Sequence, residues 1–443
     1  MLKNKILFTA LIAVSVVFSA CINTDGVELS SNANVISFSL KTGTSATFPS
    51  TTFKIDTTKN NESIYSVDSL PYLTRIDSLV PVIGTSSASE IKIIVLATAD
   101  TLTYSSTKTD TIDFSDTVKI TVVPQNKDRK KAKTFKVVLK VHQADPNLYV
   151  WTPQKSEIYS ENSIAEKMIF FNNGLNLFVK NSSNVVKLYT SENGKNWSEK
   201  TLTGFPNDFD IKYITKNADK LYIAENKKVY VSSDGISWTE HSANKDANHI
   251  LFALNNTIFG VSGNTLLMLD TTQTEFLWSR DLDLPLKFPV EGEGICVATA
   301  TAGNERAYII GGKDVDGNLL NSVWSTENGV HWANLASKNL FSVRQDVAVM
   351  QYDNLLLLFG GRDNSGVLGL SDYFVISPDY GVSWRTPYDN MAMPLDLMPR
   401  FACQFAVNDN KTIIYLVGGQ NDSGFVKDAW TGVRNEHLWE NAE

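Results

Sequence analysis

Apolar and polar residues alternate in short runs from Val35 to the C-terminus, and turn-forming residues such as Gly, Asn, Asp and Ser separate the runs. Alternation with a period of two is typical of half-buried β-strands, so the pattern predicts an all-β protein. The clearest group comprises residues 294–300, 307–312, 321–326 and 331–335. Four such runs in succession predict a four-stranded antiparallel unit.

A tryptophan recurs with these units at spacings of 41, 40, 54, 52 and 55 residues, and we assign each one to the last strand of a unit. The six are Trp197, Trp238, Trp278, Trp332, Trp384 and Trp439. Four-stranded repeats of this period are blades of a β-propeller, so the sequence predicts a six-bladed β-propeller over residues 158–443. Residues 149–152 also resemble a last strand, which leaves open how the ring closes.

Six further alternating runs precede the repeats, at residues 35–40, 52–56, 63–67, 91–98, 117–123 and 134–142. Short strands at this density predict an immunoglobulin-like (Ig-like) β-sandwich over residues 33–145. Pro146 fixes one backbone torsion and restricts the residue before it, so we expect a boundary there and a linker over residues 146–157.

The first 20 residues have the features of an export signal. Two lysines precede an apolar run at residues 6–18, which is too short to span a bilayer as a mature helix. The sequence Phe-Ser-Ala-Cys at 18–21 resembles the bacterial lipobox; the alternative is ordinary secretion with a chance cysteine. The resemblance implies a membrane anchor through a lipid on Cys21 and a flexible tether over residues 21–32. Because Ile22 rather than an aspartate follows, we expect an outer-membrane lipoprotein of the cell envelope, either periplasmic or surface-exposed.

Two repeated motifs carry a family resemblance. The phrases that begin at Thr190, Ser232, Ser325 and Ser377 and end in tryptophan resemble the Asp-box, although Glu192 and Glu327 stand at its acidic position. Paired glycines in the last three repeats resemble the kelch motif; they are Gly311-Gly312, Gly360-Gly361 and Gly418-Gly419. Both motifs occur in propellers of the sialidase and galactose-oxidase type, and neither defines a function.

Together with the N-terminal runs, these motifs make the chain similar to uncharacterised Bacteroides-type lipoproteins, which join an Ig-like domain to a kelch and Asp-box propeller. The resemblance implies a non-catalytic binding module for a glycan or a protein. In kelch proteins a ligand commonly binds at the channel mouth, where the innermost strands begin. The candidate residues at that position are Glu293, Arg344, Gln345, Asp346, Arg400 and Gln404, together with Lys167, Lys212, His249 and Glu291. The alternative is a solvated rim without a ligand.

The charge and the cysteines of the chain limit which partners and covalent links are expected. A net charge of −8, with only a short basic run at residues 127–133, argues against nucleic acid as a partner. Cys296 and Cys403 lie in apolar runs and are expected to be buried free thiols.

Enzymatic alternatives find little support. Sialidases clamp a carboxylate with three arginines, but no arginine occurs between Trp151 and Trp278. The five histidines are not placed for a galactose-oxidase copper centre. The acidic loops after the paired glycines lack the full ligand spacing of a calcium site, so no metal or cofactor is expected. The remaining enzyme hypothesis is a carbohydrate-active hydrolase or epimerase that uses a carboxylate pair, such as Glu293 with Asp346.

Overall fold

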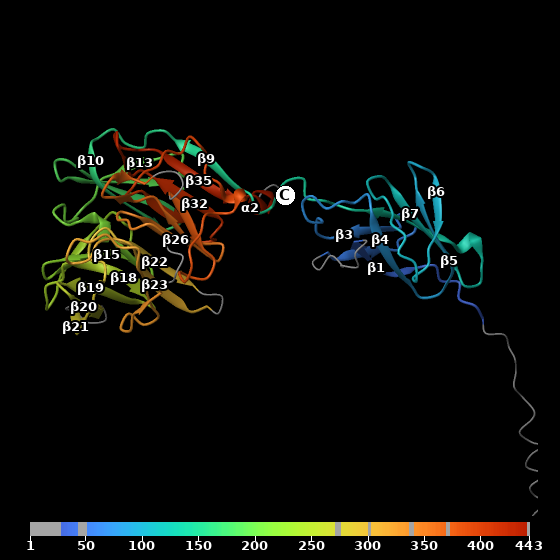
Figure 1. The fold of residues 1–443 in the computed structure, drawn as a ribbon, viewed down its shortest axis with the longest axis horizontal. Coiled ribbons are helices and arrows are strands. Elements are labelled where there is room, and N and C mark those ends of the chain that lie inside the picture. The colour runs from blue at the N-terminus through green and yellow to red at the C-terminus, as the bar shows by residue number, and fades with distance from the viewer. Residues whose placement is uncertain are drawn as a thin grey trace, which may run out of the picture. The chain divides into compact units, whose positions relative to one another are not determined.

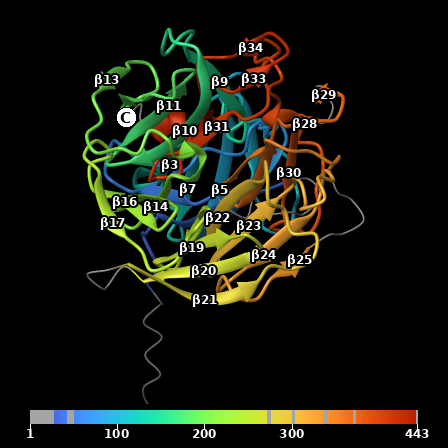
Figure 2. The ribbon, with the colours of Figure 1, turned by 90° about the vertical axis from the view of Figure 1, so that its left-hand side faces the viewer.

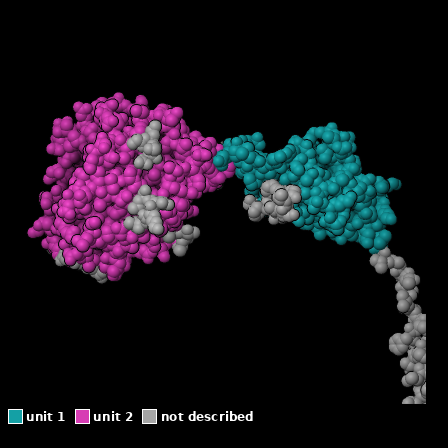
Figure 3. Space-filling view, viewed as in Figure 1, with its two compact units in different colours: residues 1–145 teal, residues 146–443 magenta. Residues whose placement is uncertain are grey.

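The computed structural model describes residues 28–42, 51–270, 276–299, 303–335, 341–368 and 373–440. The chain divides after Asp145 into two compact units, residues 1–145 and 146–443 (Figure 3). The export signal and Cys21 lie outside the described residues. Within the described ranges, no helix has the length and apolar character needed to cross a membrane.

Two sheets make up the first unit (Figure 1). The smaller sheet pairs β1 (Val35–Thr42) with β4 (Leu79–Thr85) in antiparallel fashion. The larger sheet has the order β2-β3-β8-β7-β5-β6, in which β3 and β8 are parallel. Its strands are β2 (Phe53–Asp56), β3 (Ser63–Ser66), β5 (Ala88–Val95), β6 (Asp100–Thr103), β7 (Val118–Pro124) and β8 (Lys133–Val138). The 3-10 helix η1 (Arg129–Lys131) lies between β7 and β8.

The two sheets share one apolar core. Phe38 from β1 and Ile83 from β4 pack in the same cluster as Ile120 and Phe135 of the larger sheet, and all four are buried. Two sheets over a common core form a β-sandwich. The sequence did not reveal β4, because Pro81 interrupts its apolar alternation.

The second unit contains six sheets of three or four strands among its described residues (Figure 2). We number them in chain order. Sheet 1 consists of β10 (Ser163–Phe171), β11 (Gly174–Asn181), β12 (Val186–Ser191) and β13 (Ser198–Lys200). Sheet 2 consists of β14 (Thr215–Asn217), β15 (Lys220–Glu225), β16 (Lys228–Ser232) and β17 (Thr239–Ser242). Sheet 3 consists of β18 (His249–Leu254), β19 (Thr257–Ser262), β20 (Thr265–Asp270) and β21 (Leu277–Asp283).

The remaining sheets follow the same antiparallel order. Sheet 4 consists of β22 (Gly294–Thr299), β23 (Glu305–Ile310), β24 (Val323–Thr326) and β25 (Ala333–Asn334). Sheet 5 consists of β26 (Ala348–Tyr352), β27 (Leu355–Phe359) and β30 (Phe374–Ser377), and sheet 6 of β31 (Gln404–Val407), β32 (Ile413–Val417), β35 (Ala429–Arg434) and β9 (Tyr149–Lys155). Two small ladders pair β28 (Arg362–Asp363) with β29 (Gly366–Val367), and β33 (Gln420–Asn421) with β34 (Gly424–Phe425). A short helix, α2 (Asn435–Glu440), follows β35.

The first strands of the sheets contact one another in series. β14 contacts β18, β18 contacts β22, β22 contacts β26 and β26 contacts β31, which in turn contacts β10. The 3-10 helix η2 (Ile211–Tyr213), at the start of sheet 2, contacts β10 and completes the series. Buried apolar clusters fill the space between neighbouring sheets, such as Leu177 of sheet 1 with Tyr415 of sheet 6. This arrangement is that of a β-propeller.

The outermost strand of sheet 6 comes from the N-terminal side of the unit. β9 pairs with β35 over Tyr149 to Lys155, so these residues belong to sheet 6 and the prediction of a linker over 146–157 is wrong for them. The prediction that Trp439 ends a last strand is also wrong, because that residue lies in α2. Trp151 of β9 takes the comparable place, since its ring lies against Gly432.

The Asp-box phrases form turns between the third and fourth strands. In sheet 2, Ser232 Oγ accepts from Gly235 N at 2.8 Å, and Asp234 Oδ1 accepts from Ser237 N at 2.7 Å. Asn193 fills the place of Asp234 in sheet 1, where its Oδ1 accepts from Asn196 N at 3.0 Å. In sheets 1, 2 and 4 the capping group is the residue before the glycine, which explains why glutamate is tolerated at the nominal acidic position of sheets 1 and 4. In sheet 5 the acidic position itself supplies the cap, because Asp379 Oδ1 accepts from Ser383 N at 2.8 Å.

Candidate functional site

The innermost strands begin around a cavity of about 500 Å³. Its wall contains residues 164–168 of sheet 1, 210–213 of sheet 2, 291–295 of sheet 4, 346–349 of sheet 5 and 401–405 of sheet 6. Arg362, Gln420 and Phe425, from the loops between second and third strands, complete the wall. The cavity therefore lies at the mouth of the central channel, and we call the end of the propeller unit that carries it the channel-mouth face.

The paired glycines fix the backbone at this end. Gly312 N donates to Arg344 O at 2.8 Å, so sheet 4 is tied to the residue that precedes the first strand of sheet 5. Gly360 has a φ of +67°, and a Cβ there would lie 2.3 Å from Arg400 O of sheet 6. Only glycine permits this close approach without strain.

Two of the predicted ligand-binding residues serve this backbone and not the cavity. Arg344 and Arg400 are at most 1% exposed and do not line the wall. Arg344 NH1 donates to Gly360 O at 3.2 Å, and Arg400 NH1 donates to Gly418 O at 3.1 Å. The prediction that both arginines face the channel mouth is wrong, because buried carbonyls of the paired glycines take their hydrogen bonds.

The other predicted ligand-binding residues differ in whether they line the cavity. Glu293, Asp346 and Gln404 line the cavity, as do Lys167, Lys212 and Glu291. Gln345 does not; it is buried and pairs through its backbone with Arg362. His249 lies on a smaller adjacent cavity of about 240 Å³, which shares Glu293 with the main one.

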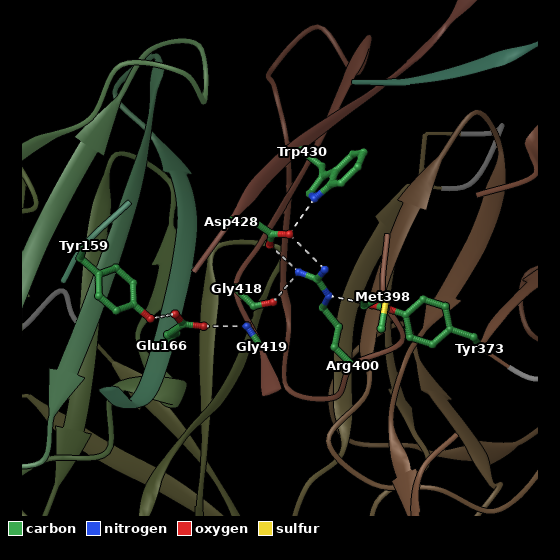
Figure 4. A network of polar contacts seen from close by, with 9 residues as sticks. All are labelled: Tyr159, Glu166, Tyr373, Met398, Arg400, Gly418, Gly419, Asp428 and Trp430. Carbon is green, nitrogen blue, oxygen red and sulfur yellow. Dashed lines mark hydrogen bonds and ion pairs between the residues drawn. The ribbon is translucent and has the colours of Figure 1, made fainter. Parts of the chain in front are cut away.

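A polar network joins sheet 1 to sheet 6 beside the cavity (Figure 4). Glu166 accepts hydrogen bonds from Tyr159 Oη and, at 2.9 Å, from Gly419 N. Burial raises the pKa of Glu166 to about 7, although these hydrogen bonds favour the ionised carboxylate. On the sheet 6 side, Arg400 forms a bidentate ion pair with Asp428, with NH1 2.5 Å from Oδ1 and NH2 3.1 Å from Oδ2. Glu166 borders the cavity, yet both of its oxygens are engaged: Oε1 accepts from Tyr159, and Oε2 accepts from Gly419 and so joins the two sheets.

Glu293 has a different environment. Its Oε2 atom is buried and has no hydrogen-bond partner among the described residues. Burial raises the pKa of Glu293 to about 7; Lys212 lowers it, and Asp346 and Glu291 raise it. A buried carboxylate oxygen without a donor is costly, so this group is prepared to receive one.

A cation and an aromatic ring form one side of the wall. Arg362 Nε donates to Asp346 Oδ2 at 2.7 Å, and the guanidinium lies 4.5 Å from the centroid of the Phe401 ring.

Tyr213 stacks on His249 at 3.6 Å between centroids, and burial lowers the pKa of His249 to about 4. Burial also lowers the pKa of Lys167, to about 8.

The carboxyl groups of the wall outnumber its cationic groups. The carboxyl groups are Glu166, Asp210, Glu291, Glu293 and Asp346, and the cationic ones are Lys167, Lys212 and Arg362. No group of three or more His, Cys, Asp or Glu residues is placed to hold a metal within the described part of the chain. The two cysteines, Cys296 and Cys403, are buried free thiols.

Sequence reasoning missed Glu166, Tyr213, Arg362 and Phe401. Arg362 was detectable in part, because it directly follows a glycine pair whose position at the channel mouth was expected. Glu166 carried no signal, since its role depends on contact with Gly419, 253 residues away.

The pKa of Glu293 gives a pH prediction. The folded state holds this proton up to about pH 7, whereas the unfolded chain releases it near the ordinary value of 4.5. The free energy of unfolding therefore falls as pH rises between these values. Glutamine does not titrate, so the free energy of unfolding of Glu293→Gln should not show this fall. As pH rises from 5 to 8, we expect it to increase by about 1–3 kcal/mol relative to that of the wild type, measured by urea unfolding. The matched control is the exposed Glu291→Gln; an equal gain there would contradict the assignment.

The fold and the cavity define the class of protein: a β-propeller with a polar cavity at the channel mouth. The family comparison agrees on the β-propeller. Residues 145–442 match the DUF6242 beta propeller domain, and residues 27–139 match the N-terminal domain of the same family of unknown function. The chain belongs to the DUF6242 family.

No curated protein matches the chain. Among solved structures it is similar to one described as "Structure of YjhT", with a TM-score of 0.45 and 15% identity over 63% of this chain and 94% of that chain.

Proposed function

We propose that this chain is a non-catalytic binding protein of the cell envelope, whose ligand enters the cavity at the channel mouth. Its six sheets are the blades of a closed ring that β9 completes. The N-terminal sandwich is an Ig-like spacer, and a lipid on Cys21 anchors the chain in the outer membrane. The short tether and spacer hold the binding unit away from the membrane.

The observation that carries the proposal is the state of Glu293. Polar groups inside a folded protein are nearly always paired, yet Glu293 Oε2 is buried, has no hydrogen-bond partner in the described part of the chain and lies on the wall of a cavity of about 500 Å³. Concave sites with a few convergent polar groups are the usual form of ligand sites. A ligand donor at Glu293 satisfies the carboxylate that the fold leaves open.

Catalysis by a carboxylate pair is the weaker alternative. Such chemistry needs two carboxyl groups free to act on the same bond. Glu166 is held by Tyr159 and Gly419, and Asp346 is held by Arg362. Asp210 Oδ1 accepts from Lys212 N at 3.1 Å and so caps η2. Glu291 is solvent-exposed, with 71% of its side chain accessible, and lies 4.0 Å from Lys313 Nζ, so it is not a buried partner for Glu293. This arrangement favours binding over turnover.

The test is a binding screen of the soluble chain, residues 22–443, on glycan and peptide arrays, followed by a turnover assay on each bound compound. We expect at least one ligand to bind without being consumed, and Glu293→Gln to weaken it by about tenfold. Glu240→Gln, an exposed carboxyl group outside the cavity wall, is the control and should bind like the wild type. Consumption of the ligand, or equal binding by the Glu293 variant, would contradict the proposal.

A further inference from the structure

Exposed apolar side chains lie at the end of the second unit that carries the cavity. In an antiparallel unit of four sequential strands, the loop from second to third strand and the connection to the next unit lie at one end. That end carries the channel mouth. Large exposed apolar residues there include Ile164, Leu286, Val315, Val343, Leu395 and Met398. On the opposite end, the exposed ones within the described residues of the second unit are Leu148, Leu277, Val382 and Leu438.

Two leucines are exposed at the tips of equivalent turns. Phe288 N donates to Pro285 O at 3.2 Å, and Leu397 N donates to Pro394 O at 3.1 Å. Phe288 and Leu397 are buried and anchor the turns, whereas Leu286 and Leu395, at the second position, are each 92% exposed.

The same turn exists without an apolar tip. Phe209 N donates to Pro206 O at 3.2 Å before the first strand of sheet 2, and Phe209 is buried in the same way. Its second position holds the exposed residue Asn207. The turn therefore needs the proline and the buried anchor but no leucine at its tip. The turn at Asn207 shows that this fold does not require Leu286 and Leu395 at the tips, and their exposure on the face that carries the cavity makes them available to a partner.

We propose that the channel-mouth face docks a polypeptide segment that carries a lysine or arginine between apolar residues. This inference rests on the proposed function and names its ligand class. The basic head group enters the cavity and donates to Glu293, while the flanking apolar residues pack on Leu286 and Leu395. Five carboxyl groups against three cationic ones in the wall favour a positive charge at that position.

Other occupants fit less well. A second copy of the chain places an acidic cavity against an acidic cavity, which repels. An anionic membrane surface is disfavoured by the same carboxyl groups and by the net charge of −8. Aliphatic tips bury area against apolar partners, whereas a sugar offers mainly hydroxyl groups. The chain itself enters this unit at the opposite end, where Tyr149 pairs with Arg434.

The test measures how tightly short synthetic peptides bind to residues 22–443. Each peptide has Lys, Arg, Ser or Glu at its centre and either leucine or serine on both sides. Fluorescence anisotropy gives the dissociation constants. We expect leucine-flanked Lys and Arg peptides to bind, and Glu-centred or serine-flanked ones to bind at least about tenfold more weakly. The double variant Leu286→Asn with Leu395→Asn copies the natural turn at Asn207 and should lose at least about tenfold. Leu277→Asn with Val382→Asn, on the opposite face, is the matched control and should change binding by less than about twofold.

The remaining outcomes separate this inference from the proposed function. Glycan binding that survives the Leu286 and Leu395 changes, with no peptide bound, would keep the cavity as a site and overturn the polypeptide. Binding to lipid vesicles that needs both leucines would overturn it in favour of a membrane surface. If no glycan, peptide or vesicle binds, both the inference and the proposed function are contradicted.

Discussion

A chain that begins at Ser156 is expected not to unfold cooperatively, whereas one that begins at Pro146 does. The difference between them is β9, the outer strand of sheet 6. Tyr149 is buried and packs edge-on against Tyr352 with centroids 5.6 Å apart, and Gln154 Nε2 donates to Thr431 Oγ1 at 2.7 Å. Loss of one large buried aromatic side chain costs about 3–5 kcal/mol, and the whole native state is stable by only about 5–15 kcal/mol.

The measurement is urea unfolding of both chains, followed by tryptophan fluorescence and circular dichroism. Trp151→Ala in the full chain is the matched point variant, because the ring lies on Gly432 and its removal leaves the strand in place. We expect an intermediate loss of about 3 kcal/mol for it. Equal urea midpoints for the chains that begin at Pro146 and Ser156 would show that β9 does not hold the ring together.

Asp428→Ala is expected to destabilise the second unit by about 3–5 kcal/mol, because it leaves the Arg400 guanidinium buried and without its counter-charge. The side chain of Arg400 is 1% exposed, so water cannot replace the lost carboxylate. Asp428 also accepts from Trp430 Nε1 at 2.8 Å, so the variant leaves this indole N–H without its acceptor as well. The same guanidinium donates to Gly418 O, next to Gly419, which donates to Glu166 (Figure 4). The effect should therefore reach the joint between sheets 1 and 6.

Thermal and urea unfolding of the variant check this expectation. Glu240→Gln is the control, because it alters the solvent-exposed pair of Lys228 and Glu240, and exposed ion pairs contribute little. The control should unfold at the wild-type midpoint. If Asp428→Ala also unfolds there, the buried pair does not support the joint.

Much of the propeller could be predicted, because each repeat forms the same turn and the same tryptophan contact from residues that are close in the sequence. The turn at Asp234-Gly235 and the tryptophan at 238 depend on neighbours within a few residues, so the sequence displays them. The failure at Trp439 has the opposite cause. The last strand of sheet 6 comes from residues 149–155, which pair with β35. This partner is far away in the sequence, so the residues around 439 give no sign of it.

The site was harder to predict, because residue type does not reveal the direction of a side chain. Arg344 and Arg400 stand before inner strands like the cavity residues, but the carbonyls of Gly360 and Gly418 draw them into the core. The carboxylates of Glu293 and Asp346 accept hydrogen bonds and cannot bond to those carbonyls, and both residues lie in the wall. The turn leucines Leu286 and Leu395 give no sequence signal either, since an apolar residue is ordinarily taken as core.

The central claim is that the channel-mouth face binds the ligand, and hydrogen–deuterium exchange of residues 22–443, with and without the tightest binder of the array screen, tests it most directly. We expect the ligand to slow amide exchange in residues 164–168, 291–295 and 401–405, which line the cavity. Exchange in the turns at residues 191–197 and 232–238, between third and fourth strands at the opposite end, should not change. Protection confined to those turns, or to residues 28–142 of the first unit, would contradict the claim.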